Sequence, residues 1–372
     1  MEIRIETKEF IPSLAQVASV VMAKNTLPIL DCVLFDVNEV GDAKLTASDG
    51  EIWLSVKTKV LSCDQAMKFC LPVNDFLKAL RNLGETEVTM KFDEEKKVVE
   101  CTYGNGDFAL PYQGAEDYPQ SLATFDDAKD FIFDAANFVR AIEKVDFAVG
   151  NDDLRPIING VNFDFTNNAM IAVAMDGLKL AKYCDSGITH EDAQTYSFVL
   201  PTKSATIVKS ILMNMDGRVK IVFNASSFAI NNSEFKLTTR LLEGKYLNYN
   251  SVIPQASEKK AILNKEAFTT ALRRVALMSS AKNGYMALHF TSDKVTVSAE
   301  DVDFSRSANE EVMCEYNGED MTIGFNSAVI TSVVANCETD DVTIELNTPT
   351  TAAIVYEANR DEYFSLVMPM AL

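Results

Sequence analysis

Three segments of the chain carry apolar residues at the spacing of an amphipathic helix. In each, a phenylalanine is followed by apolar residues four and seven positions later, which lie on one helix face: Phe10, Leu14 and Val17; Phe138, Ile142 and Val145; Phe268, Leu272 and Val275. The three phenylalanines are almost evenly spaced along the chain. The pattern predicts three helices in equivalent places of a long repeat.

Other predicted elements recur with the same period. Strand-like alternation ends in an acidic turn three times, at Asp49, at Asp176 and at Glu300-Asp301. A second helix is expected in each repeat, with Asn74, Thr202 and Asn326 as candidate N-caps. Alternating segments then predict strands at residues 87–92, 98–103 and 107–112, at 219–223, 227–231 and 235–241, and at 341–346, 352–357 and 363–368.

The repeat predicts an α+β protein made of three tandem copies of a pseudo-duplicated helix-and-sheet domain. Segments rich in proline and acidic residues separate the copies near residues 118–127 and 252–258. We therefore expect domains at residues 1–125, 126–256 and 257–372. Repeats of this length are domains in their own right, whereas solenoid repeats are much shorter.

Composition narrows the class of protein. The apolar stretches of the 372-residue chain are far shorter than the roughly 20 residues that span a bilayer. Residues 1–30 lack the order of charges typical of a signal peptide, and the seven cysteines form no Cys-x-x-Cys pair. We therefore expect a cytoplasmic protein with reduced thiols.

The sequence offers little catalytic chemistry. It has only two histidines, and neither phosphate-binding nor dinucleotide-binding glycine motifs occur, so no metal, cofactor or catalytic residue is predicted. The alternative is an acidic hydrolase that uses Asp49, Asp176 and Asp301. These residues occupy equivalent turns of successive repeats, whereas a catalytic acid and base have to converge, so we favour a non-catalytic protein.

Charge is distributed unevenly. The net charge of the chain is −20. The six predicted helices carry +5, so the rest of the chain carries −25. Helices gathered on one side would form a positive lining inside a negative shell. Solvated polar helix faces would explain the same numbers.

Local motifs in register with the repeat give the chain a family resemblance. They occur in order along the whole chain, at residues 25–30, 155–160, 174–180, 242–246, 252–254, 323–326 and 367–372. Together they resemble the bacterial sliding clamp family, the beta subunits of DNA polymerase III. The resemblance implies a head-to-tail homodimeric ring, with helices lining the inside and sheets outside, that encircles duplex DNA without reading its sequence. It also implies partners that carry a clamp-binding motif, among them the replicative polymerase alpha subunit and the clamp loader.

The resemblance also assigns residues to three surfaces. The DNA-facing candidates are Lys24, Lys78, Arg81, Arg140, Arg155, Lys203, Lys209, Arg273 and Arg274. At the dimer joint, Phe108 and Leu110 of one subunit would pack against Leu277 and Met278 of the other. A hydrophobic groove for partner peptides would use Ile158, Met175, Gly177, Leu178, Lys179, Leu180, Leu247, Val252, Asn326, Val367, Met368, Pro369, Met370 and Leu372.

The groove departs from the usual family pattern at several positions. Met175, Leu178, Leu247, Ser251, Val329 and Ala371 stand where Thr, His, Pro, Arg, Tyr and Arg, respectively, are frequent, and Lys179 retains the charge of the usual Arg. We therefore expect an apolar groove with fewer side-chain hydrogen-bond donors and a different motif preference.

Overall fold

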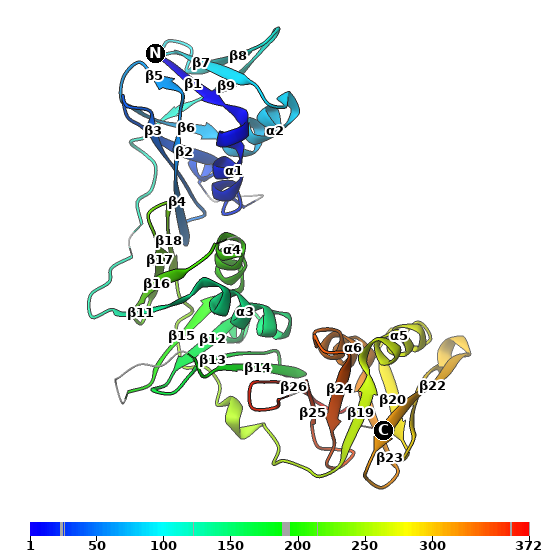
Figure 1. Cartoon of the computed structure of the whole chain (residues 1–372). Helices are drawn as coiled ribbons and strands as arrows, with labels where there is room; N and C mark the ends of the chain where they lie inside the picture. The colour runs from blue at the N-terminus through cyan, green and yellow to red at the C-terminus, as the bar shows by residue number, and fades with distance from the viewer. Residues whose placement is uncertain are drawn as a thin grey trace. The chain divides into compact units, whose positions relative to one another are not determined.

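The computed structural model of the chain (Figure 1) describes residues 1–22, 25, 27–121, 123–187, 194–213, 215–357 and 359–371. The backbone packs into two compact units. One contains residues 1–136 and 206–241, and the other contains residues 137–205 and 242–372. Each unit thus includes part of the middle third of the chain, whose predicted borders at 125 and 256 stay a prediction.

All six predicted helices are present. The α-helices of the described residues are α1 (Thr7–Ala18), α2 (Val73–Leu83), α3 (Ala135–Val145), α4 (Thr202–Leu212), α5 (Lys265–Ala276) and α6 (Ser327–Ala335). Short 3-10 turns occupy Pro28–Asp31, Asp146–Ala148, Pro156–Ile158, Tyr249–Ser251 and Val302–Phe304.

The first unit contains two antiparallel sheets. The five-stranded sheet runs β5 (Ser62–Cys63), β1 (Glu2–Glu6), β7 (Glu87–Asp93), β8 (Val98–Tyr103) and β9 (Gly106–Pro111). The nine-stranded sheet runs β10 (Gln113–Gly114), β6 (Met67–Pro72), β2 (Cys32–Val37), β3 (Asp42–Ser48), β4 (Ile52–Lys59), β18 (Phe235–Arg240), β17 (Ser227–Asn231), β16 (Arg218–Phe223) and β11 (Lys129–Asp134). The pair β4–β18 joins strands that lie far apart in the chain, and we call it the first seam.

The second unit contains one antiparallel sheet of twelve strands. Its order is β15 (Tyr196–Pro201), β12 (Gly160–Phe165), β13 (Met170–Met175), β14 (Lys179–Asp185), β26 (Tyr363–Val367), β25 (Ala353–Tyr356), β24 (Asp341–Glu345), β19 (Lys260–Asn264), β22 (Arg306–Tyr316), β21 (Lys294–Asp301), β20 (Tyr285–Phe290) and β23 (Met321–Asn326). The pair β14–β26 is the equivalent long-range contact, and we call it the second seam.

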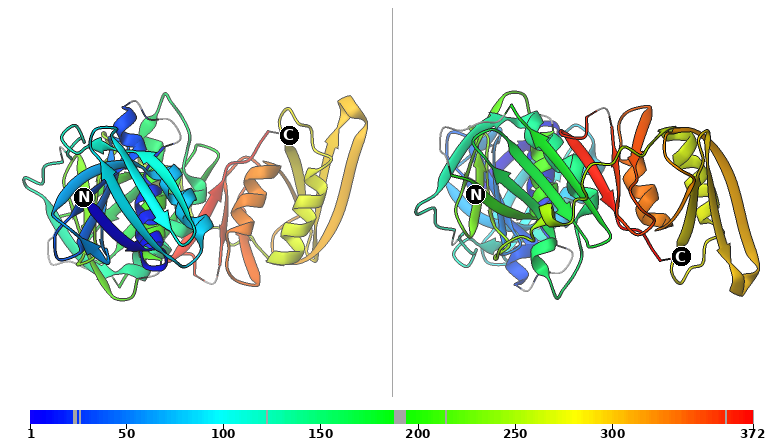
Figure 2. Two further views of the ribbon diagram at one scale, coloured as in Figure 1. Left: turned by 90° about the horizontal axis from the view of Figure 1, so that it is seen from above. Right: turned by 90° about the horizontal axis from the view of Figure 1, so that it is seen from below.

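Helices cover one face of these sheets because their apolar stripes are buried there. The stripe residues predicted from the sequence are all at most 1% exposed. The ring of Phe138 in α3 stacks on Phe163 of β12, with 4.8 Å between the ring centroids. Helices α1 and α2 pack together, and so do α5 and α6, which Figure 2 shows side by side on one face of their strands. The helical periodicity therefore predicted the core correctly.

The predicted helix caps have mixed outcomes. Asn326 is the N-cap of α6, and its side chain accepts hydrogen bonds from the backbone N–H groups of Ala328 and Val329. Asn74 is not a cap, because α2 already begins at Val73 and follows Pro72. Thr202 is the first residue of α4, and its hydroxyl donates to the carbonyl of Asn159 at 2.6 Å.

Candidate functional site

The second seam forms the floor of the predicted peptide groove. Leu180 of β14 lies opposite Leu366 of β26 in the antiparallel register. Both are almost fully buried in one apolar cluster with Met175 and with Tyr246 and Tyr249, which lie in the linker between β18 and β19. The hydroxyl of Tyr249 donates to Asp164 at 2.8 Å and so ties the linker to this face of the sheet. The floor therefore already exists without a partner.

Leu366 and Val367 lie on opposite faces of the sheet. Val367 pairs with Lys179, one residue along from Leu366, so strand alternation directs its side chain to the opposite sheet face. Leu366 is the residue of this pair that lies in the cluster. The period of two in β26 is the signal that could have separated them.

The two isoleucines of the 3-10 turn at Pro156–Ile158 also lie in different surroundings. Ile158 is buried, but its side chain lies close to Gly150, where an added Cβ would be 2.9 Å away. Its neighbour Ile157 packs against the floor cluster. Only the fold of this turn distinguishes the two isoleucines.

One edge of the groove is the turn between β13 and β14. The carboxylate of Asp176 accepts hydrogen bonds from the backbone N–H groups of Leu178 and Lys179, and it binds the Lys179 ammonium at 2.6 Å. Gly177 has a φ of +93°, a conformation that favours glycine, although an added Cβ would meet nothing within 4 Å. Asp176 thus organises the turn, and Asp49 similarly accepts from two backbone N–H groups of its own turn.

The C-terminal segment lies directly beside that turn. The backbone N–H of Met368 donates to the carbonyl of Leu178, and that of Met370 donates to the carbonyl of Gly324 in β23, both at 2.8 Å. Residues 368–370 therefore connect the turn before β14 to the outermost strand of the sheet. Asn326, at the end of that strand, is engaged in its helix cap, and Leu372 lies outside the described residues.

An exposed apolar rim surrounds the buried floor. Leu178, Leu247, Val252 and Met368 are between 40% and 52% exposed, although all are large apolar residues. They come from the turn, the linker and the C-terminal segment. A cluster of exposed apolar side chains above a buried apolar floor is typical of a surface that binds another chain.

The predicted DNA-facing residues differ in what they contact. Arg140, Arg155 and Arg274 form ion pairs with Glu338, Asp152 and Glu310 at 2.8–3.2 Å. The Arg155 guanidinium, together with backbone hydrogen bonds, holds the pKa of the Asp152 carboxyl below its usual range. Lys78, Arg81 and Arg273 are exposed and form no ion pair among the described residues, while Lys203 and Lys209 are half-buried. Lys24 lies outside the described residues.

The residues predicted for the dimer joint lie on an edge strand, Phe108 and Leu110, and just beyond helix α5, Leu277 and Met278. Strand β9, which carries the half-buried Phe108 and Leu110, is the last strand of its sheet. In β22, residues 314–316 pair with β19. The longer first part, residues 306–313, pairs with β21, and within the described residues its other side has no partner strand. Leu277, just beyond α5, is 73% exposed, and Met278 is half-buried.

Sequence reasoning missed two further apolar residues beside that edge. Val302 and Phe304 immediately precede β22 and are among the most exposed large apolar residues described. The guanidinium of Arg306 lies 5.1 Å from the centroid of the Phe304 ring. Their exposure depends on the 3-10 turn they occupy, and no periodic pattern indicates it.

Comparison with known proteins identifies the family. Models of the N-terminal, central and C-terminal domains of the DNA polymerase III beta subunit match residues 1–122, 133–248 and 250–371. The chain belongs to this family. It is 26% identical to the beta sliding clamp of Pseudomonas putida, with both chains covered completely. Two solved sliding clamps of Pseudomonas aeruginosa, one bound to griselimycin, superpose with TM-scores of 0.92 at 25% and 26% identity over 100% of both chains.

Membership of the beta-subunit family confirms several predictions. The fold is the α+β clamp fold of three domains, and the protein is a sliding clamp rather than an enzyme. The alternative of an acidic hydrolase is therefore dropped.

No described helix is long and apolar enough to cross a membrane. Within the described ranges, no group of three or more His, Cys, Asp or Glu side chains is arranged to hold a metal ion.

Proposed function

We propose that two copies of the chain close head-to-tail into a ring around duplex DNA and tether the replicative polymerase, the clamp loader and other motif-bearing proteins. The observation that carries the proposal is the full-length match to three consecutive clamp domains, supported by a buried apolar cluster at the second seam with exposed apolar residues beside it. Because its partners act on chromosomal DNA, we place the protein in the bacterial cytoplasm.

The joint of the ring would pair edge β9 of one copy with the open edge of β22 of the other. Unpaired strand edges with exposed apolar side chains readily associate with another strand, so both surfaces are suited to this role. Phe108 and Leu110 would meet Leu277 and Met278, and the exposed Val302 and Phe304 would extend the apolar contact. A head-to-tail arrangement uses the joint twice and closes the ring.

DNA would be held by topology and by weak phosphate contacts. Sliding requires contacts that ignore sequence and exchange quickly, which few basic residues in an acidic chain provide. Three of the candidate arginines already share their charge with carboxylates. We therefore expect Lys78, Arg81 and Arg273 to contribute more to DNA contact than Arg140, Arg155 and Arg274.

The groove would bind short linear peptides through apolar anchors. Leu180, Leu366 and Met175 form its floor, and the flexible thioethers of Met368 and Met370 let its wall adapt to different side chains. Most binding energy in such interfaces comes from a few anchor residues. The replacement of polar family residues by Met175 and Leu178 favours anchoring by shape over side-chain hydrogen bonds.

Retention on DNA tests the proposal. The protein is placed on nicked circular DNA by a clamp loader and ATP and then moved to high salt. A closed ring stays on the circle and leaves when the DNA is cut, whereas ionic binding weakens with a slope of about 0.9 per contacted phosphate whatever the DNA shape. Equal loss from circular and linear DNA would refute encirclement.

Two variants separate the joint from the groove in the same assay. Changing Leu277 to Ala and Met278 to Lys places a charge at the apolar joint, so this double variant should be monomeric and should not be retained. A chain ending at Val367 loses the hydrogen bonds of Met368 and Met370 but keeps β26, so it should be retained yet fail to bind a motif peptide or stimulate polymerase. Peptide binding within about twofold of the full chain would place the groove elsewhere.

A further inference from the structure

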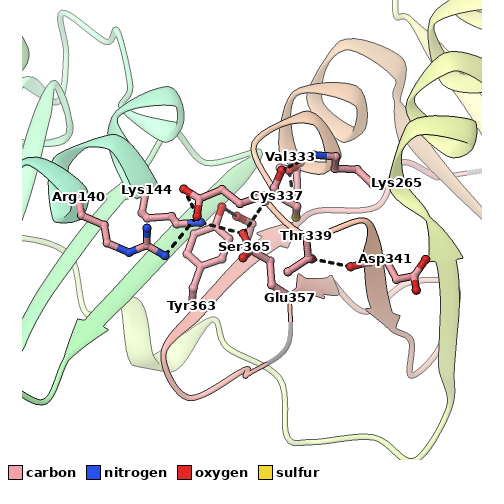
Figure 3. Close-up of polar contacts among 11 residues, drawn as sticks. Arg140, Lys144, Lys265, Val333, Cys337, Thr339, Asp341, Glu357, Tyr363 and Ser365 are labelled. Carbon is pink, nitrogen blue, oxygen red and sulfur yellow. Dashed lines mark hydrogen bonds and ion pairs between the residues drawn. The ribbon is translucent and has the colours of Figure 1, made fainter.

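A buried lysine lies on the helix side of the second seam. Lys144, in the last turn of α3, has a side chain only 3% exposed. Its ammonium binds the carboxylates of Glu357 at 2.8 Å and Glu338 at 3.1 Å, and it lies 4.7 Å from the centroid of the Tyr363 ring (Figure 3). Lysine is rarely buried, because removing its charge from water is costly unless it is fully paired.

The partners of Lys144 come from separate parts of the unit. Glu338 lies in the segment after α6, Glu357 follows β25, and Tyr363 begins β26. The backbone N–H of Glu338 also donates to Glu357 at 2.9 Å, which links the two acidic residues. Lys144 therefore fixes α3 to two loops and one strand that lie far beyond it in the chain.

Arg140 extends the cluster to the other strand of the seam. One turn before Lys144 on α3, it binds Glu338 at 3.2 Å and hydrogen-bonds Tyr183 of β14. Figure 3 shows Arg140 and Lys144 pointing from the same helix toward the side where Glu357 and Tyr363 lie. With two cations and two carboxylates the cluster is neutral, and it contacts both strands of the seam.

The cluster lies across the sheet from the groove. Tyr183 and Tyr363 are opposite one another in the register and three residues from the pair Leu180 and Leu366. Strand alternation therefore places the tyrosines on the helix face and the leucines on the groove face. The turn at Leu178 precedes β14 and the segment at Met368 follows β26. The backbone hydrogen bond from Met368 to Leu178 joins them, so both continue the seam and are placed by its two strands.

We propose that Lys144 is a positioning residue for the predicted peptide groove: by holding α3, Glu338, Glu357 and β26 together beneath the seam, it fixes how β14 and β26 present the joined turn at Leu178 and segment at Met368 beside the apolar floor. The inference rests on the groove function proposed above. Apolar side chains of the same volume often stabilise a fold as well as a buried ion pair does, and in some proteins a buried charge network is kept because it fixes one arrangement. The predicted benefit is therefore in peptide affinity rather than in folding alone.

The test compares four proteins, each titrated with a fluorescent peptide carrying a glutamine and two apolar anchors. They are the wild type, Lys144→Met, the double variant Lys144→Met/Glu357→Gln, and the control Lys220→Met, which removes an exposed ion pair with Asp130. Lys144→Met leaves the Glu357 carboxylate buried without its cation, and adding Glu357→Gln removes that unpaired charge. Hydrogen exchange of the β14 and β26 amides reports the seam directly.

We expect Lys144→Met to lose affinity by about fivefold or more and to exchange faster in β14 and β26, with no such change in Lys220→Met. The double variant should regain thermal stability but not affinity. Affinity that is unchanged in Lys144→Met, or that recovers along with stability in the double variant, would overturn the positioning role and leave the groove intact. No binding by the wild type would instead refute the groove function and this inference with it.

Discussion

The two seams are built alike in the backbone and differently beneath it. Each joins two antiparallel strands through five residue pairs, β4 with β18 and β14 with β26. The helix side of the first seam holds a hollow of about 610 Å³, lined by α1 residues such as Ser13, Ala15 and Gln16 and by Ser210, Ile211 and Met215. The second seam has the Lys144 cluster on its helix side.

The difference indicates how one joint design serves two purposes. The strand pairs join the sheets in both cases, but side chains determine how firmly the helices are held over them. Side chains that line a hollow open to solvent contact protein atoms on one side only, so they can shift at lower cost than side chains in a packed core. The buried pair of Lys144 and Glu357 resists such a shift, because moving either residue leaves the other charge unpaired. The seam that the Lys144 cluster holds is the one at which the peptide groove is predicted.

Lys144→Ala should have the largest effect. It leaves the buried Glu357 without its cation, although Glu338 keeps Arg140, and removing one partner of a buried pair costs about 3–5 kcal/mol. Lys57→Ala, at the exposed rim of the hollow, should change stability by less than about 0.5 kcal/mol. Urea unfolding followed by circular dichroism measures the whole chain, while the single tryptophan, Trp53 in β4, reports the first seam.

We expect Lys144→Ala to shift the circular dichroism transition to lower urea and leave the Trp53 transition nearly unchanged. Trp53 is held by a hydrogen bond from its indole N–H to the carbonyl of Pro119 at 3.2 Å, within the first unit. Equal shifts by both probes would mean that the chain unfolds as one cooperative body and that the seams are not energetically separate.

Filling the hollow should have a moderate, opposite effect. Ala15→Leu adds methyl and methylene groups to the half-buried lining of the hollow, and each fully buried methylene is worth about 0.8 kcal/mol. Because the hollow opens to solvent, we expect a gain of about 1 kcal/mol in the Trp53 transition. Ala18→Leu, on the same helix but outside the hollow's lining, is the control. A loss of stability in Ala15→Leu alone would show that the space is not available to a side chain.

Sequence periodicity predicted what local physics controls. The stripe of Phe138, Ile142 and Val145 specifies a buried helix face whatever the rest of the chain does, and the strands at 98–103 and 227–231 have their predicted bounds. Family resemblance supplied the groove residues, and these stay a prediction. Leu366 belongs to the buried cluster and Ile157 packs against it, while the predicted Val367 and Ile158 are buried outside that cluster.

Long-range features of the site were beyond such reasoning. In the sequence, Lys144 follows Arg140 by one helical turn and reads as part of a solvated polar face. It is buried because Glu338 and Glu357, distant in the chain, fold over it. Asn74 failed as a cap for a local reason, since α2 starts one residue earlier, directly after Pro72. Burial and charge pairing depend on tertiary contacts, which periodicity does not encode.

Acid should weaken the contacts of the second seam by protonating Glu338. The resulting loss of stability should be the smallest of the predicted effects. Partial burial of Glu338 raises the pKa of this carboxyl, but Lys144 and Arg140 lower it more, so the pKa lies below its usual value of 4.5. A lowered pKa means that the ionised group stabilises the fold at neutral pH and that this contribution disappears as the pH falls through the lowered pKa. The side chain is 55% exposed, so solvent and salt weaken the effect.

Glu338→Gln isolates that contribution. At pH 7 the variant should unfold at slightly lower urea than the wild type by circular dichroism. The difference should shrink below about pH 4.5 and vanish once the wild-type carboxyl is protonated. Added salt should reduce the difference at pH 7, because the pair is partly in water. The Trp53 transition should show none of this dependence, since the Glu338 pair belongs to the other unit. A difference that persists undiminished at low pH would mean that Glu338 acts through its backbone or its packing, and the second seam would then be pinned by Lys144 and Glu357 alone.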